Sequence, residues 1–317
     1  MRRRGDSQRP SIAGAARETR QVALEALGLG DKLNARLCAG RCGTIAPSRG
    51  APAALRIDRP GVQRDVILYE YPFNESIRTM LRLEHLFERL GQLVVRDTAV
   101  DHHFALATLF EILDVGSRAD LKSDLLKDLD KQRSMLGSYR GNPSISEAVL
   151  EDVMARIDAA FVALNQMPGK AGATLTANEW LMAIRSRISI PGGTCGFDLP
   201  AYYAWQHSEP ERRRNELLLW AKGLMPMADA LQLLLRLIRE SGVPHKVMAV
   251  AGQFQQSLPP GRAHLLARLR LADGQIDMVP EISGHRLVVS VRFLQPDAEG
   301  KLRPSVLDTP FELTLCS

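Results

Sequence analysis

Hydrophobic side chains recur with two different periods along this chain, and the change of period divides its organised part. From about residue 74 to residue 241, apolar residues recur every three or four positions, which is typical of amphipathic helices. We expect two such repeats to face a common core: Leu121, Leu125 and Leu129, and Val149, Val153, Ile157 and Phe161. After Pro244, apolar and polar residues alternate, and this alternation predicts strands.

Capping signatures mark where the predicted helices begin. Asn74 precedes the first helix and is suited to accept a hydrogen bond from a free backbone amide. Further helices are predicted at capping boxes, in which a hydroxyl side chain binds a free amide and an acidic residue three positions on returns the bond. The boxes are Ser117 with Asp120, Ser144 with Glu147, Thr176 with Glu179, and Ser208 with Glu211. Pro210 occupies a favoured first helical position.

The strands predict an antiparallel sheet with one solvated face that carries arginines. A short strand at 66–71 ends at Pro72, and later strands are predicted at 247–252, 265–271, 287–293 and 311–315. Asp273 and Gly274 predict a hairpin turn after the strand at 265–271. Helices that are segregated from a sheet in this way define the α+β fold class.

The same patterns predict three segments. Residues 1–64 mix Arg, Ala, Gly, Pro and Ser without a sustained apolar period, so we expect a disordered basic leader. No Met occurs between Met1 and Met80, while Val62 and Val66 stand where the pattern becomes regular, so this leader is also interpreted as a mis-assigned start. Residues 65–241 form a mainly helical domain with the short first strand and a glycine-turn segment at 190–200. Residues 242–317 form the antiparallel β domain.

The net charge is distributed unevenly along the chain. The whole sequence of 317 residues carries +5, but residues 1–64 hold 13 Lys and Arg against 5 Asp and Glu, which is +8. Residues 65–317 hold 28 against 31, which is −3. Since the predicted folded body lacks a basic excess, the charge disfavours nucleic acid as its partner.

No known catalytic motif occurs in the chain. The sequence has no phosphate-binding glycine loop, no nucleophile elbow and no zinc spacing, and we expect neither a cofactor nor a metal. The cysteines are too few and too scattered for a disulfide framework, so we expect free thiols at Cys38, Cys42, Cys195 and Cys316. No run approaches the roughly 18 apolar residues that a membrane helix needs, so we expect a cytoplasmic protein without a membrane partner.

A Cys-dependent enzyme that uses Cys195 stays open as an alternative, with Asp101, His102 or His103 as a source of a base. Neither group has a partner at a diagnostic spacing, so we expect Cys195 and Phe197 to pack inward and the two histidines to lie at a solvated helix start. The run 212–214 of three arginines is surrounded by acidic residues, so it predicts the exposed face of a helix.

Four separated blocks of the sequence resemble the ZapD family of cell-division factors. They are Leu68–Glu84 (LYEYPFNESIRTMLRLE), Ile184–Arg187 followed by Ile190–Pro200, Leu237–Ser241 (LIRES), and Ile282–His285 with Val291–Phe293. The match runs in order from about residue 66 to the end, and residues 1–64 have no counterpart in it.

This resemblance implies a cytoplasmic, non-catalytic homodimer at the mid-cell division ring. It implies binding of the carboxy-terminal peptide of FtsZ and the cross-linking of FtsZ filaments into bundles. That peptide is short, flexible and acidic, so an arginine-lined groove would suit it. The candidate contacts are Arg78, Arg82, Arg185, Arg187, Arg236, Arg239, His285 and Arg292. A nucleic-acid or other acidic-partner binding module stays open as a second alternative.

Overall fold

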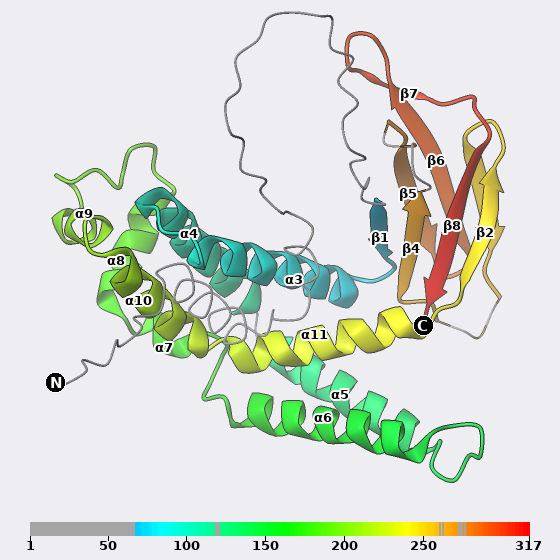
Figure 1. The fold of residues 1–317 in the computed structure, drawn as a ribbon, viewed down its shortest axis with the longest axis horizontal. Coiled ribbons are helices and arrows are strands. Elements are labelled where there is room, and N and C mark those ends of the chain that lie inside the picture. The colour runs from blue at the N-terminus through cyan, green and yellow to red at the C-terminus, as the bar shows by residue number, and fades with distance from the viewer. Residues whose placement is uncertain (1–66, 118–120, 260, 262, 272–274, 276) are drawn as a thin grey trace, which may run out of the picture. The chain divides into compact units, whose positions relative to one another are not determined.

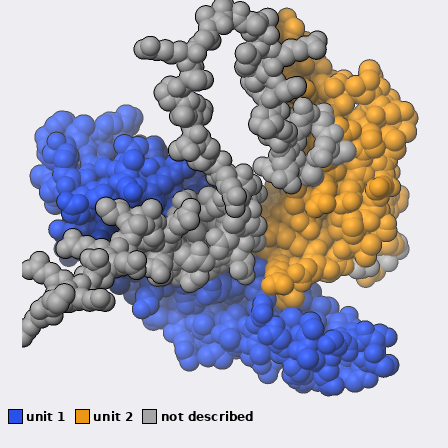
Figure 2. Space-filling model, viewed as in Figure 1, with its two compact units in different colours: residues 1–41, 82–234 blue, residues 42–81, 235–317 orange. Residues whose placement is uncertain are grey.

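The computed structural model describes residues 67–317 except 118–120, 260, 262, 272–274 and 276. Its described part divides into two compact units, coloured separately in Figure 2. Unit 1 holds Arg82–Leu234, and unit 2 holds residues 67–81 and Leu235–Ser317. The predictions for residues 1–64 and for the turn at Asp273 and Gly274 lie outside the described residues.

Unit 1 is helical, and unit 2 holds the strands, so the predicted α+β class is confirmed (Figure 1). Helices α3 and α11 run across the boundary between the units. The helices are α3 (Glu75–Val94), α4 (Ala99–Gly116), α5 (Leu121–Gly137), α6 (Glu147–Gln166), α7 (Ala173–Thr176), α8 (Glu179–Ile188), α9 (Pro200–Gln206), α10 (Pro210–Lys222) and α11 (Met225–Glu240).

The predicted caps are partly correct. Asn74 accepts a hydrogen bond from the Ile77 N–H at 2.8 Å, as expected. Ser117 is the C-cap of α4, and Asp120 lies outside the described residues. Two other helices begin later than their boxes: α6 has Ser146 at the N-cap, and α8 has Asn178, whose side chain accepts from the Leu181 N–H at 3.1 Å. Their acidic residues lie in the first helical turn, where the positive end of the helix dipole favours them without a capping box. Glu209 rather than Ser208 precedes α10.

The buried stripe of α6 differs from the predicted one. Leu121, Leu125 and Leu129 of α5 are buried as expected, but Val149 is exposed. A row of four-residue steps turns by about 40° per step around a helix, so it leaves the core face within a few turns. The stripe that α6 buries is Leu150, Met154, Ile157 and Leu164.

Unit 2 contains two antiparallel sheets instead of one. Sheet A has the strand order β1-β4-β8-β2, and sheet B has the order β3-β6-β5 with β7 paired to β6. The strands are β1 (Leu68–Pro72), β2 (Pro244–Ala249), β3 (Gln253–Ser257), β4 (Leu266–Leu271), β5 (Val279–His285), β6 (Val288–Pro296), β7 (Leu302–Pro304) and β8 (Thr309–Cys316). Strand β1, which we predicted within the segment 65–241, pairs with β4.

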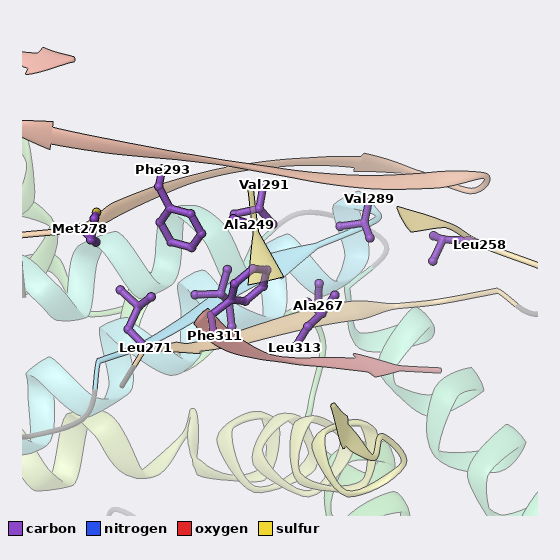
Figure 3. Packing of buried hydrophobic residues seen from close by; sticks show 11 residues of the cluster. Ala249, Leu258, Ala267, Leu271, Met278, Val289, Val291, Phe293, Phe311 and Leu313 are labelled. Carbon is purple, nitrogen blue, oxygen red and sulfur yellow. The ribbon is translucent and has the colours of Figure 1, made fainter. Parts of the chain in front are cut away.

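The two sheets face each other across one hydrophobic core (Figure 3). Side chains alternate along each strand, so Leu269 of β4 and Leu313 of β8 point inward while Arg268 and Arg270 point outward. Phe293 of β6 meets Phe311 of β8 edge to face, with ring centroids 5.3 Å apart. Each sheet therefore has one buried face and one outer face.

The predicted strand at 247–252 ends early, at Ala249. A turn follows, in which Ala251 has φ +47° and donates its N–H to the Asp308 carboxylate at 2.8 Å. Gly252 has φ +72°, and a Cβ on it would lie 2.2 Å from the Ser305 carbonyl oxygen. The alternating pattern at 247–252 therefore includes a turn at its end, and this turn requires glycine at position 252.

Candidate functional site

The outer face of sheet B carries a row of polar side chains from three strands. Gln253 of β3 lies opposite Arg292 of β6, which in turn lies opposite Glu281 of β5. The adjacent row on the same face consists of Gln255, Ser290 and Ser283. An open groove of 530 Å³ follows these two rows.

Arg292 is the cation of this groove. Its Nη1 lies 3.6 Å from Glu281 Oε2, and both side chains are about 60% exposed, at 59% and 60%. An exposed ion pair of this kind stabilises a protein by at most about 1 kcal/mol because water screens it. The guanidinium can therefore exchange Glu281 for another carboxylate at little cost.

His285 shares this outer face with Arg292. It ends β5 opposite Val288, four residues along the strand from Glu281, which corresponds to about 13 Å at the usual strand rise. Its Nδ1 accepts the Leu287 N–H at 3.3 Å across the hairpin turn. The structure thus brings two of the predicted residues onto one surface.

Arg239 lies on the opposite side of unit 2, at the outer face of sheet A. The Glu70 carboxylate accepts from Arg239 Nε at 2.8 Å and Nη2 at 2.6 Å, and also from Arg268 Nε at 2.9 Å. The side chains of Arg239 and Glu70 are only 16% and 17% exposed. This forked pair ties the last turn of α11 to β1 and β4.

A second contact joins two blocks of the family resemblance within unit 2. The Tyr71 hydroxyl lies 3.2 Å from the Gly284 N–H and 3.3 Å from its carbonyl oxygen. A Cβ on Gly284 would lie 2.6 Å from the Phe73 ring, so the close approach requires glycine. The block at 68–73 therefore packs against the block at 282–285 and pairs with the block at 237–241.

The remaining predicted residues lie on helices. Arg78 pairs with Glu75 at 3.3 Å on α3, Arg82 is exposed one turn later, and Arg236 pairs with Glu240 at 2.9 Å on α11. On α8, Arg185 pairs with Asp114, and Arg187 lies 4.0 Å from Asp198. Of the eight predicted residues, Arg292 and His285 lie on the outer face of sheet B, and the other six lie on helices α3, α8 and α11.

Two predictions about unit 1 are wrong, at His102 and at Arg213, whereas Arg212 is exposed as expected, with 67% of its side chain open to solvent. His102 is fully buried, and burial together with the charge of Arg213 holds the pKa of its imidazole below the ordinary value. Arg213 is buried as well, and it donates to His102 Nδ1 at 3.0 Å and to the Asp97 carbonyl at 2.7 Å. Arg213 is not part of a solvated helix face, because its donors bind the His102 ring and the backbone carbonyls of Asp97 and Gln206. His102 is not part of one either, because it is buried and accepts one of these hydrogen bonds.

The glycine-turn segment also differs from its prediction. Cys195 and Phe197 are exposed instead of packed inward. Among the described residues, the Cys195 thiol makes no hydrogen bond to a histidine, and His103 Nδ1 lies 2.7 Å from the Tyr202 hydroxyl. Burial raises the pKa of that hydroxyl, so it stays protonated at neutral pH.

The described residues contain no group of three or more His, Cys, Asp or Glu placed to hold a metal ion. No single helix among them is both long and apolar enough to cross a membrane, although the bent pair α10 and α11 meets that test by length and composition.

The sequence did not single out Glu70, Arg268 or the glutamines of β3. Glu70 lies 198 residues before Arg268 in the chain, and the pairing register of β1 with β4 places the two side by side. Gln253 and Gln255 line the groove only because β3 pairs with β6, which places them beside Arg292 and Ser290. Knowledge of which strands pair, and in which register, would have identified both the Glu70–Arg268 pair and the glutamines of β3.

Comparison with known proteins supports the same family that the sequence blocks resemble. The family model for ZapD, described as a cell division protein, matches residues 81–292. A cell division protein ZapD of Ralstonia pickettii is 51% identical over 252 residues, which cover 80% of this chain and all of the relative. A cell division protein ZapD of Ralstonia nicotianae is 52% identical over 252 residues, which again cover 80% of this chain and all of the relative.

The chain belongs to the ZapD family of cell division proteins. Its relatives are named as cell division proteins and not as enzymes.

Proposed function

We propose that this protein binds the carboxy-terminal peptide of FtsZ and, as a homodimer, cross-links FtsZ filaments at the mid-cell division ring in the cytoplasm. Membership of the ZapD family supports the role in division. The open polar groove on sheet B, with Arg292 at its centre, is the observation that carries the choice of site.

The chemistry of the groove suits a short acidic segment. Arg292 offers a planar, exposed guanidinium that can bind a carboxylate through two parallel hydrogen bonds. Gln253, Gln255 and the two serines beside it offer amide and hydroxyl groups that bind backbone N–H and C=O groups. An extended peptide can follow the two polar rows and place an acidic side chain at Arg292.

A dimer makes this binding useful for cross-linking. A single groove per chain holds one tail, whereas a symmetric pair of chains presents two equivalent grooves. Two linked sites also increase the effective concentration of the second tail once the first is bound. The predicted residues on α3, α8 and α11 are secondary candidates for contact with the filament.

Peptide binding in variants of the groove tests the proposal. Arg292→Glu replaces attraction by repulsion and should weaken binding of a fluorescent FtsZ tail peptide roughly ten- to a hundred-fold. Arg303→Glu is the matched control, because Arg303 is equally exposed in unit 2 and pairs with Asp297 at 3.0 Å outside the groove. Equal affinities for the two variants would contradict the proposed site.

A further inference from the structure

Strand β3 lies at an edge of sheet B and lacks the features that discourage a further strand from pairing. Its residues, Gln253–Ser257 (QFQQS), include no proline and no charged side chain, and all but one of them are exposed. Each of the other edge strands in the described part of the chain contains a proline, which removes a backbone donor. These prolines are Pro72 in β1, Pro244 in β2, Pro280 in β5 and Pro304 in β7.

The pairing of β3 with β6 leaves part of the β3 backbone without a partner strand. The Leu258 N–H donates to the Leu287 carbonyl at 2.8 Å, just beyond the paired segment. In an antiparallel pair every second residue makes such bonds, so the backbone groups of Gln255 and Ser257 point away from β6. No bond to the backbone N–H of either residue occurs among the residues that the structure describes. This edge therefore offers two donors and two acceptors to an added strand.

The opposite edge of sheet B shows how such groups are covered elsewhere in unit 2. Gly284 of β5 also points its backbone groups away from β6, and the Tyr71 hydroxyl lies 3.2 Å from its N–H and 3.3 Å from its carbonyl oxygen. Gln255 and Ser257 have no such cover among the described residues, and both are exposed. The difference marks β3 as the open edge of this sheet.

The groove next to this edge presents a positive charge to an added strand. The strands follow one another in the order β3, β6 and β5, so Arg292 of β6 lies closer to the open edge than Glu281 of β5 does. Neighbouring strands are about 4.8 Å apart, so an added strand would lie about 10 Å from β6. An arginine and a glutamate side chain together bridge that distance. A segment that carries a carboxylate is therefore favoured over a basic one.

We propose that the acidic tail peptide of FtsZ binds as an added strand along β3, with one carboxylate directed towards Arg292. The inference rests on the proposed function and specifies how the peptide is held at that site. Hydrogen bonds to the backbone of Gln255 and Ser257 supply affinity, and the alternate peptide side chains that face the groove supply specificity.

A proline in β3 tests this contact in the protein. Gln255→Pro removes the outward N–H but leaves the bonds between β3 and β6 in place, because the Gln255 N–H takes no part in them. Affinity for a fluorescent FtsZ tail peptide should fall roughly tenfold or more, since a donor is lost and the proline ring stands in the path of the added strand. Gln255→Ala is the matched control, because it keeps the N–H and should retain most of the affinity. Thermal unfolding should be nearly unchanged in both variants.

Backbone N-methylation of the peptide tests the same contact with the wild-type protein. In an added strand every second N–H faces β3, so single N-methyl groups should lower affinity about tenfold at alternate positions and change it little between them. The absence of this alternation, or equal affinities of Gln255→Pro and Gln255→Ala, would overturn the strand addition. If Arg292→Glu still weakened binding in that case, the proposed site would stand. An unchanged affinity of Arg292→Glu would contradict the proposed site as well.

Discussion

Replacing Glu70 by glutamine should destabilise unit 2 strongly for a single change outside the hydrophobic core. The substitution keeps the shape of the side chain but removes the carboxylate that lies within 2.6 to 2.9 Å of Arg239 and Arg268. Two guanidinium groups with little access to water would then face each other without a counter-charge. Removing one partner of a fully buried ion pair costs about 3–5 kcal/mol.

Because these side chains retain some exposure, we expect a smaller loss, of about 2–3 kcal/mol in the free energy of unfolding. For a protein of this size that corresponds to a fall in Tm of roughly 4–12 °C. Differential scanning calorimetry at neutral pH measures it. Glu281→Gln is the control, because it removes a carboxylate from an exposed pair of the same unit and should change Tm little.

A double-mutant cycle decides whether the loss comes from the pair itself. Glu70→Gln and Arg239→Gln should each destabilise unit 2, and the double variant should be more stable than the sum of the two losses predicts, by at least about 1 kcal/mol. Additive losses, or a change in Tm no larger than that of Glu281→Gln, would refute the role assigned to this cluster.

Three further predictions concern other parts of the molecule. Acid should weaken unit 1: the unfolded chain takes up a proton at His102 near its ordinary pKa of 6.5, whereas the folded state with its lowered pKa resists that proton. Stability present above pH 6.5 should therefore fall towards pH 5, by up to about 1.4 kcal/mol per pH unit, and His102→Asn should flatten this slope in urea melts. Gly284→Ala should lower Tm because the new methyl group collides with Phe73, and an unchanged Tm would contradict the packing described. Binding of the FtsZ peptide should weaken steadily as salt rises, since charges around Arg292 are screened over about 8 Å at physiological ionic strength; affinity that is independent of salt would point to an apolar site.

Local periodicity explains which parts of the fold the sequence could predict. Alternation at 265–271 and 287–293 correctly separated the inward Leu269 and Phe293 from the outward Arg268 and Arg292, because a strand has a period of two wherever it pairs. The same alternation says nothing about which strand pairs with which. The division into two sheets, and the pairing of β1 with β4, therefore needed the three-dimensional structure.

Side chains that bind distant backbone atoms were the hardest to predict. Arg213 stands in sequence among glutamates, which favoured a solvated face, but its donors reach Asp97, His102 and Gln206. Conversely, Phe197 was expected in the core on its hydrophobicity alone, and the glycine turns direct it outward. Arg292 and His285 were found from the sequence because family blocks carry them, while the groove along Arg292 depends on strand register.

Sedimentation with polymerised FtsZ tests the cross-linking role most directly. Low-speed centrifugation collects bundled filaments, so the wild-type protein should bring full-length FtsZ into the pellet together with itself. FtsZ that lacks its carboxy-terminal peptide should remain in the supernatant, and Arg292→Glu should lose bundling while Arg303→Glu keeps it. Equal bundling of FtsZ with and without the peptide would contradict the proposed mechanism.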